Sequence, residues 1–170
     1  MKYRVILADP PWRFSTWSNK GRDRCPETRH YETMSLEEIA ALQIPSADSS
    51  FLFLWAYQPM LPDSLRVMEA WEFRYVTIAF VWVKTGGIGH GYYTRSGSEL
   101  CLLGRKGNGR ADVKDHSIRQ VIETPRREHS RKPDEIYDRI ECLLDGPYLE
   151  LFARTKRAGW DAWGDQAGTW

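Results

Sequence analysis

Short apolar runs alternate with amphipathic segments along this chain of 170 residues. Five runs consist largely of β-branched, aromatic and other apolar residues, which is typical of strands covered on both faces of a sheet. They are residues 3–8, 51–56, 75–83, 98–103 and 148–152. We expect a strand in each of them, with residues 148–152 as the last clear strand of the chain.

Three segments between these strands carry apolar residues at helical spacing. A helix is expected directly after Ser35, because Ser35 and Glu38 have the spacing of a capping box. Its apolar face consists of Leu36, Ile39, Ala40 and Leu42. A second helix is expected over residues 62–71, and the side chains expected to face inward are Leu65, Val67 and Met68.

A third helix is expected to begin at Pro133 and to end at Gly146-Pro147. Proline is favoured at the first helical position, and Asp134 and Glu135 add negative charge to the first turn. Its apolar stripe consists of Ile136, Ile140, Leu143 and Leu144.

Strands that alternate with helices indicate an α/β fold, with a mostly parallel sheet and helices on both faces. The length suits a single domain over residues 1–170. Binding sites of such folds lie at the carboxyl ends of the strands. Four residues follow or end the predicted strands, and we expect them to meet in one crevice: Asp9, Trp55, Lys84 and Arg154.

Composition narrows the class of protein. Hydrophobic residues make up 42% and charged residues 28%, as in globular proteins, and the net charge of +1 creates no global basic field. Cys25, Cys101 and Cys142 show no metal-ligand spacing, so we expect no metal site. Since no run resembles a signal peptide or a membrane span, we expect a soluble protein in the cytoplasm.

The tetrapeptide Asp9-Pro10-Pro11-Trp12 directly follows the first apolar run. A carboxylate and a proline carbonyl can both accept hydrogen bonds from an exocyclic amine, and an indole can stack on a planar ring. This combination favours methyl transfer to the amine of adenine. The plain alternative is a turn aspartate that precedes two prolines at a strand end.

The tetrapeptide and six later motifs, in this order, resemble the family named after the catalytic subunit of eukaryotic mRNA N6-adenosine methyltransferase. The compact members in bacteria and phages are the most similar. The later motifs lie at residues 30–35, 51–55, 82–85, 99–104, 132–137 and 150–154. The resemblance implies a Rossmann-like fold with circularly permuted motif order, in which the catalytic motif precedes the cofactor motif.

The resemblance also implies S-adenosylmethionine as methyl donor and S-adenosylhomocysteine as product. By this resemblance the catalytic residues are Asp9, Pro10, Pro11 and Trp12, and the cofactor-binding residues are Asp9, Lys132, Arg154, Asp165 and Gln166. The last pair departs from the family, which usually has Asn-Gln or Asn-Glu there; an aspartate can accept but not donate. For Lys132 the alternative is a solvated lysine in front of a helix.

Two loops rich in arginine, residues 13–31 and 124–132, are expected to flank the mouth of the crevice. We expect contacts to nucleic-acid phosphates from them, although ordinary solvated charge is the alternative. Tyr31 is either a wall of the adenine pocket or a packed loop aromatic. The expected substrate-binding residues are Trp12, Arg13, Arg29, Tyr31, Arg126 and Arg127. Core packing is the default for Trp55 and Trp82.

The function that this sequence predicts is methyl transfer from S-adenosylmethionine to the N6 amine of adenine in DNA. The alternatives are the same reaction on RNA and a catalytically silent scaffold that binds nucleic acid; an intact Asp9 speaks against the last. No target-recognition domain is visible, so we expect relaxed sequence specificity or a partner that supplies it. We expect a monomer or homodimer in a bacterial or phage-infected cell.

Overall fold

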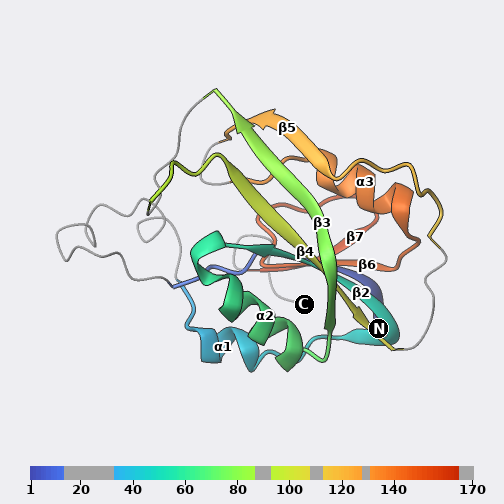
Figure 1. Ribbon diagram of the computed structural model, residues 1–170. Helices are drawn as coiled ribbons and strands as arrows, with labels where there is room; N and C mark the ends of the chain where they lie inside the picture. The colour runs from blue at the N-terminus through green and yellow to red at the C-terminus, as the bar shows by residue number, and fades with distance from the viewer. Residues whose placement is uncertain (14–32, 87–92, 108–112, 128–130, 165–170) are drawn as a thin grey trace.

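The computed structural model describes residues 1–13, 33–86, 93–107, 113–127 and 131–164. These residues form one seven-stranded sheet with helices on both faces (Figure 1). The strands are β1 Tyr3–Ala8, β2 Ser46–Ala56, β3 Arg74–Thr85, β4 Ser98–Lys106, β5 Val121–Pro125, β6 Tyr148–Leu151 and β7 Trp160–Trp163. The helices are α1 Leu36–Ala40, the 3-10 turn η3 Gln58–Met60, α2 Leu61–Ala70 and α3 Glu135–Leu143.

The strand order is β5-β3-β4-β2-β1-β6-β7. Strand β4 runs antiparallel to both of its neighbours, β2 and β3, whereas the four other pairings are parallel. The expected α/β class with a mostly parallel, Rossmann-like sheet is therefore confirmed. Strand β1 lies between β2 and β6 and is parallel to both, so the motifs that follow β1 and β6 meet where these strands end.

The two faces of the sheet carry separate cores, as expected for strands that are apolar on both sides. Helices α1 and α2 cover one face, where Ile39 and Val67 pack against side chains such as Ile6. Helix α3 covers the other face through Ile136 and Ile140. Figure 1 shows α1 beside α2, with α3 next to β5 on the other side.

Helix α1 begins as the sequence predicts. The backbone N–H of Ser35 donates to Oε2 of Glu38 over 2.7 Å, and the N–H of Glu38 donates to Oγ of Ser35 over 3.2 Å. Helix α2 fulfils the prediction only in part, because Val67 and Met68 are buried but Leu65 is 37% exposed. Its inward face is set by Ser64, whose hydroxyl donates to the carbonyl of Met60 and is thereby satisfied inside the core.

Other boundaries differ from the sequence prediction. Helix α3 starts at Glu135 with Asp134 as its cap, so Pro133 precedes the helix rather than opening it. Residues 148–152 are not the last strand, because β7 follows and pairs with β6 in parallel. With four residues, β7 is too short to show a period, and β5 is a five-residue edge strand with mixed polarity. The sequence prediction therefore missed both outermost strands.

Candidate active site

One row of side chains crosses the carboxyl edge of the sheet on the face that α3 covers. Leu7 of β1 lies directly opposite Phe53 of β2 and Glu150 of β6, so these three share a face. Successive side chains of a strand alternate between faces. Asp9 and Trp55, each two residues further along, therefore belong to the same face, at the end of β1 and β2.

The row continues across the two strands beyond β2. Glu99 of β4 lies directly opposite Trp82 of β3, and Lys84 follows Trp82 by two residues. Trp82 and Cys101 belong to the core under α3, so Glu99 and Lys84 face the same side as that core. Five neighbouring strands thus bring charged or aromatic side chains to one edge, although they are distant in sequence.

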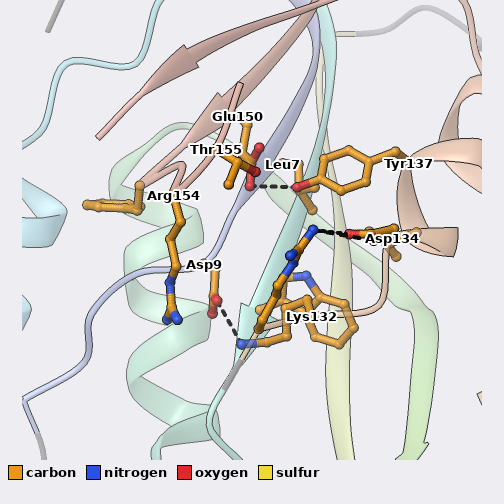
Figure 2. Close-up of a pocket in the computed structure, with 12 residues that line it drawn as sticks. Leu7, Asp9, Lys132, Asp134, Tyr137, Glu150, Arg154 and Thr155 are labelled. Carbon is orange, nitrogen blue, oxygen red and sulfur yellow. Dashed lines mark hydrogen bonds and ion pairs between the residues drawn. The ribbon is translucent and has the colours of Figure 1, made fainter. Parts of the chain in front are cut away.

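An open cavity of about 530 Å³, its mouth included, lies at this edge (Figure 2). Its walls come from the ends of β1, β2 and β6, from the segment after β6, and from the start of α3. The lining residues are Leu7, Asp9, Trp55, Arg131, Lys132, Asp134, Ile136, Tyr137, Glu150, Phe152, Arg154 and Thr155.

The Lys132 ammonium lies between the main charged and aromatic groups of the site. It donates to Oδ2 of Asp9 over 2.7 Å and lies 3.2 Å from Oε2 of Glu99. The same ammonium sits 5.5 Å from the ring centroid of Trp55. Oε1 of Glu99 is occupied by the ammonium of Lys84. Figure 2 shows the Asp9 carboxylate turned toward Lys132, although the two residues are 123 positions apart.

The electrostatics keep these groups charged. Burial would lower the pKa of Lys132, but Asp9 and Glu99 more than offset it, so the pKa lies above its ordinary value. Burial likewise would raise the pKa of Glu99, yet Lys132 and Lys84 hold it below the ordinary range. The site therefore contains fixed ammonium and carboxylate groups in surroundings with little water.

A second carboxylate behaves differently. Glu150 sits deeper in the cavity and accepts a hydrogen bond of 2.9 Å from the Tyr137 hydroxyl (Figure 2). Burial raises the pKa of Glu150 to about 7; the Tyr137 hydrogen bond lowers it, and the Asp9 charge raises it. The pKa of Tyr137 is raised as well, by burial and by the Glu150 charge. Near neutral pH, Glu150 is thus poised to gain or lose a proton.

The rim of the cavity is formed where α3 begins. Asp134 accepts from Arg131 over 3.1 Å and lies 2.7 Å from a guanidinium nitrogen of Arg127. Burial would raise the pKa of Asp134, but the two arginines hold it below the ordinary value. The pairing ties Arg127 and Arg131 to the helix cap and places positive charge at the mouth.

The backbone of Asp9-Pro10-Pro11-Trp12 is held by short contacts. The carbonyl of Pro10 accepts from the N–H of Trp12 over 2.9 Å, and the carbonyl of Pro11 accepts from the N–H of Met34 over 2.9 Å. The indole N–H of Trp12 donates to the carbonyl of Trp55 over 3.3 Å. The Trp12 side chain is only 8% exposed and belongs to the core under α1 and α2.

The structure brings several predicted site residues together and leaves others apart. Asp9, Lys132, Arg154 and Trp55 line one cavity. Lys84 does not line it but reaches Lys132 through Glu99. Among the predicted substrate residues, Arg13 donates to the carbonyl of Thr33, Arg126 is exposed and Arg127 pairs with Asp134. Four predicted residues lie outside the described residues: Arg29, Tyr31, Asp165 and Gln166.

Sequence reasoning missed three site residues, namely Glu99, Tyr137 and Glu150. A signal for two of them was present, because Glu99 and Glu150 are charged residues inside otherwise apolar strand segments. A buried carboxylate needs a partner, so such a position near the end of an apolar strand is a candidate site residue. Tyr137 gives no such signal, since an aromatic residue on a helix is ordinary core.

The described parts of the chain show no sign of two other kinds of site. Among these residues, no three His, Cys, Asp or Glu side chains gather in a way that could hold a metal ion. Within the same residues, no helix has the length and apolar character needed to cross a membrane.

Comparison with known proteins adds the family. Residues 3–166 match the MT-A70 family. The type II methyltransferase M.MunI of Mycoplasma sp is 35% identical over 180 residues, which cover 96% of this chain and 77% of that protein. The N(6)-adenosine-methyltransferase MT-A70-like protein of Arabidopsis thaliana is 32% identical over 175 residues, 96% of this chain. The human N(6)-adenosine-methyltransferase catalytic subunit METTL3 is 33% identical over 162 residues, 90% of this chain.

The two eukaryotic relatives are much longer. The chain covers 24% of the Arabidopsis protein and 26% of the human one, about a quarter of their length. The family match nevertheless runs from β1 past β7 and includes every strand described above. This chain belongs to the MT-A70 family.

Proposed function

We propose that the chain transfers a methyl group from S-adenosylmethionine to the N6 amine of adenine in DNA. Membership of the MT-A70 family supports an adenine N6-methyltransferase. The observation that carries the proposal is Asp9 at the cavity, with Lys132 bound to one of its two oxygens. DNA is preferred to RNA because the chain covers most of a type II methyltransferase and only a quarter of the N6-adenosine enzymes.

The donors and acceptors of the cavity fit S-adenosylmethionine. That molecule carries a carboxylate, an ammonium, a positively charged sulfonium and a ribose with two hydroxyls. The cavity offers the cations Lys132, Arg154 and Arg131 on the one hand and the carboxylates Asp9 and Glu150 on the other. We propose that Lys132 and Arg154 hold the anionic and ribose groups and that Asp9 and Glu150 face the positive ones.

Asp9 and Pro10 act on the substrate amine in this proposal. The lone pair of that amine is delocalised into the adenine ring, which makes it a weak nucleophile. Two acceptors aimed at its hydrogens favour a pyramidal nitrogen and localise the lone pair. Lys132 occupies Oδ2 of Asp9, which leaves Oδ1 as the proposed acceptor. The Pro10 carbonyl already accepts from Trp12, and its second lone pair is the other acceptor.

S-Adenosylmethionine, when bound, supplies a methyl group on an electron-poor sulfur. The chain's own residues then have to orient the amine and exclude water, which is positioning and electrostatic catalysis. Asp9 need not be a strong base, because the amine loses its proton only after the methyl has arrived. We propose that the hydrogen bond from Trp12 to the Trp55 carbonyl fixes the indole in the core under α1 and α2, where it supports the Pro10 backbone rather than stacking on the adenine.

Nucleic acid is the proposed partner of the arginines near the site. Exposed Arg126 would contact phosphates, and Arg13 and Arg127 would join it from the two flanking loops. Arg29 and Tyr31 keep their proposed roles from the sequence. The target base has to leave the stack of a duplex, because its amine is otherwise out of reach of the cavity. We also propose that the protein is a monomer or homodimer in the cytoplasm and that a partner supplies its sequence specificity.

One experiment tests this function. The protein is incubated with labelled S-adenosylmethionine and with DNA or RNA oligonucleotides of matched sequence, and the digested nucleosides are identified by mass spectrometry. The expected product is N6-methyladenine in DNA. Product in RNA alone would move the assignment to RNA, for which the N6-adenosine relatives argue. No methylated adenine in either polymer would contradict the proposal.

A further inference from the structure

Four charged side chains alternate in sign along the edge of the sheet: Asp9, Lys132, Glu99 and Lys84. Glu99 uses its oxygens separately, since Oε2 lies 3.2 Å from the Lys132 ammonium while Oε1 accepts from Lys84. Lys132 in turn holds Oδ2 of Asp9 over 2.7 Å. A continuous chain of ion pairs therefore runs from the end of β3 to the end of β1.

This chain of ion pairs is shielded from water. The exposed side-chain fractions are 13% for Lys84, 21% for Glu99, 14% for Lys132 and 25% for Asp9. Each ammonium lies over a tryptophan ring. The Lys84 ammonium is 5.0 Å from the ring centroid of Trp82. The Lys132 ammonium is 5.5 Å from the ring centroid of Trp55. Charges interact strongly in such surroundings, and an unpaired one is costly.

Trp82 fixes the end of this row of ion pairs at which Lys84 lies. Its side chain is fully buried, and its indole N–H donates to the hydroxyl of Thr124 on β5 over 2.8 Å. Lys84 follows Trp82 by two residues on the same face and leans back over this ring. The position of the Lys84 ammonium is therefore set by the packed core rather than by solvent.

Lys132 stands between two competing carboxylates. With Lys84 in place, Glu99 is already neutralised through Oε1, and the four charges sum to zero. Without Lys84, Glu99 and Asp9 would share a single ammonium, and Lys132 would be drawn away from Asp9. Lys84 is absent from the residues that line the cavity, so any influence on the cavity passes through Glu99.

We propose that Lys84 is a positioning residue: through Glu99 it holds the Lys132 ammonium on Oδ2 of Asp9 and so fixes the carboxylate at the cavity. The last step, from a fixed Asp9 to methyl transfer, rests on the proposed function. The coupling from Lys84 to Glu99 and Lys132 stands without it.

The rival role for Lys84 is a direct contact to a nucleic-acid phosphate. Such lysines extend into solvent as mobile charges. Lys84 instead has a side chain that is 13% exposed and an ammonium already engaged by Glu99 and the Trp82 ring. The geometry favours the positioning role, and kinetics separate the two.

The chain offers a matched control at the opposite end of β4. Lys106 pairs with Glu72 and donates to the hydroxyl of Ser46 over 3.1 Å, with a side chain that is 25% exposed. Lys106→Met removes a Lys–Glu pair of the same kind from the same sheet, far from the cavity. Lys84→Met removes the positioning charge, and Lys84→Arg keeps it.

In steady-state methylation of DNA, Lys84→Met is expected to lower kcat about tenfold or more, while the KM for DNA changes less than about twofold. The deficit in kcat should shrink as pH falls through the pKa of Glu99, which rises once Lys84 no longer lowers it, because a protonated Glu99 no longer competes with Asp9 for Lys132. Lys84→Arg should recover most of kcat, and Lys106→Met should match the unmodified protein. Unchanged kcat with a raised KM for DNA and a weaker salt dependence would identify a phosphate contact and overturn the proposal.

A carboxyl NMR titration tests the coupling without any need for activity. With ¹³C-labelled glutamate, the Glu99 signal is assigned by its loss in Glu99→Gln. Its midpoint should rise in Lys84→Met and stay in place in Lys106→Met. An unmoved midpoint would refute the coupling even if methylation were observed, whereas a shifted midpoint in a protein without activity would refute only the proposed function. If thermal unfolding shows that Lys84→Met is not folded, Lys84→Gln replaces it in both experiments.

Discussion

The two faces of the sheet are built from the same strands but end differently at the carboxyl edge. On the face under α1 and α2, β2 ends in Ala56 and its partner on β4 is Leu100, so the apolar surface continues to the rim. On the face under α3, the same edge carries Asp9 after β1, Glu99 near the start of β4 and Lys84 near the end of β3. Because successive side chains of a strand point to opposite faces, the odd or even position of a residue along its strand decides which face carries the charged groups.

The largest expected effect comes from the charged end of the α3 face. Asp9→Ala removes the proposed acceptor and leaves Lys132 with Glu99, and we expect kcat to fall on the order of 10³-fold. Asp63→Asn is the matched control, because Asp63 pairs with Arg66 on the surface of α2. Initial rates with DNA measure both. Methylation by Asp9→Ala at more than a tenth of the normal rate would remove Asp9 from the mechanism.

Below the edge the two faces should behave alike. Leu102→Ala on the α1 and α2 side and Ile140→Ala on the α3 side each empty a fully buried position. Each should lower the free energy of unfolding by about 3 kcal/mol, through lost burial and a residual cavity. Urea unfolding at pH 7 measures the two. A cost below about 1 kcal/mol on one side only would show that the two cores are not equivalent.

Much of this comparison follows from the sequence. The apolar runs located five strands, and Ser35 with Glu38 located the start of α1, because the signal in each case is local. Helix α2 was oriented wrongly at Leu65, since the sequence does not show that the Ser64 hydroxyl can be satisfied by a carbonyl inside the core. Strands β5 and β7 escaped notice because their edge positions demand no continuous apolar run.

The site was predictable only in outline. The family resemblance implied that Asp9, Lys132 and Arg154 share the cofactor site, and they line one cavity. The pairing of Lys132 with Glu99, and of Tyr137 with Glu150, depends on which residues of β4, β6 and α3 face each other across the sheet. Such contacts arise from strand order and register, which an apolar pattern does not specify.

A smaller effect is expected from Glu150, which sits within the α3 face rather than at its rim. Its folded pKa of about 7 exceeds the ordinary 4.5, so the folded state holds this proton more tightly and the stability that it adds falls as pH rises from 4.5 to 7. The change that Glu150→Gln makes in the free energy of unfolding should therefore be more favourable at pH 8 than at pH 4.5, by about 1–2 kcal/mol after allowance for partial exposure. Urea unfolding at both pH values checks this, and a destabilisation that grows toward pH 8 would contradict it.

The smallest effect is expected from Arg126, which is exposed outside both cores. Arg126→Ala should weaken DNA binding by about 0.5–1 kcal/mol and reduce the slope of log K against log salt by about one. Fluorescence anisotropy at salt concentrations from about 50 to about 200 mM measures the affinity for DNA and its salt dependence. Arg66→Ala, on the outer side of α2, is the control. An unchanged slope would remove Arg126 from the proposed phosphate contacts.

A crystal structure with S-adenosylmethionine and an adenine nucleotide tests the central claim most directly, because it shows which face and which edge hold the two ligands. We expect both in the cavity between Asp9 and Arg154, with the adenine amine about 3 Å from Oδ1 of Asp9 and Lys132 still on Oδ2. Ligands seated on the α1 and α2 face, or an amine directed away from Asp9, would contradict it.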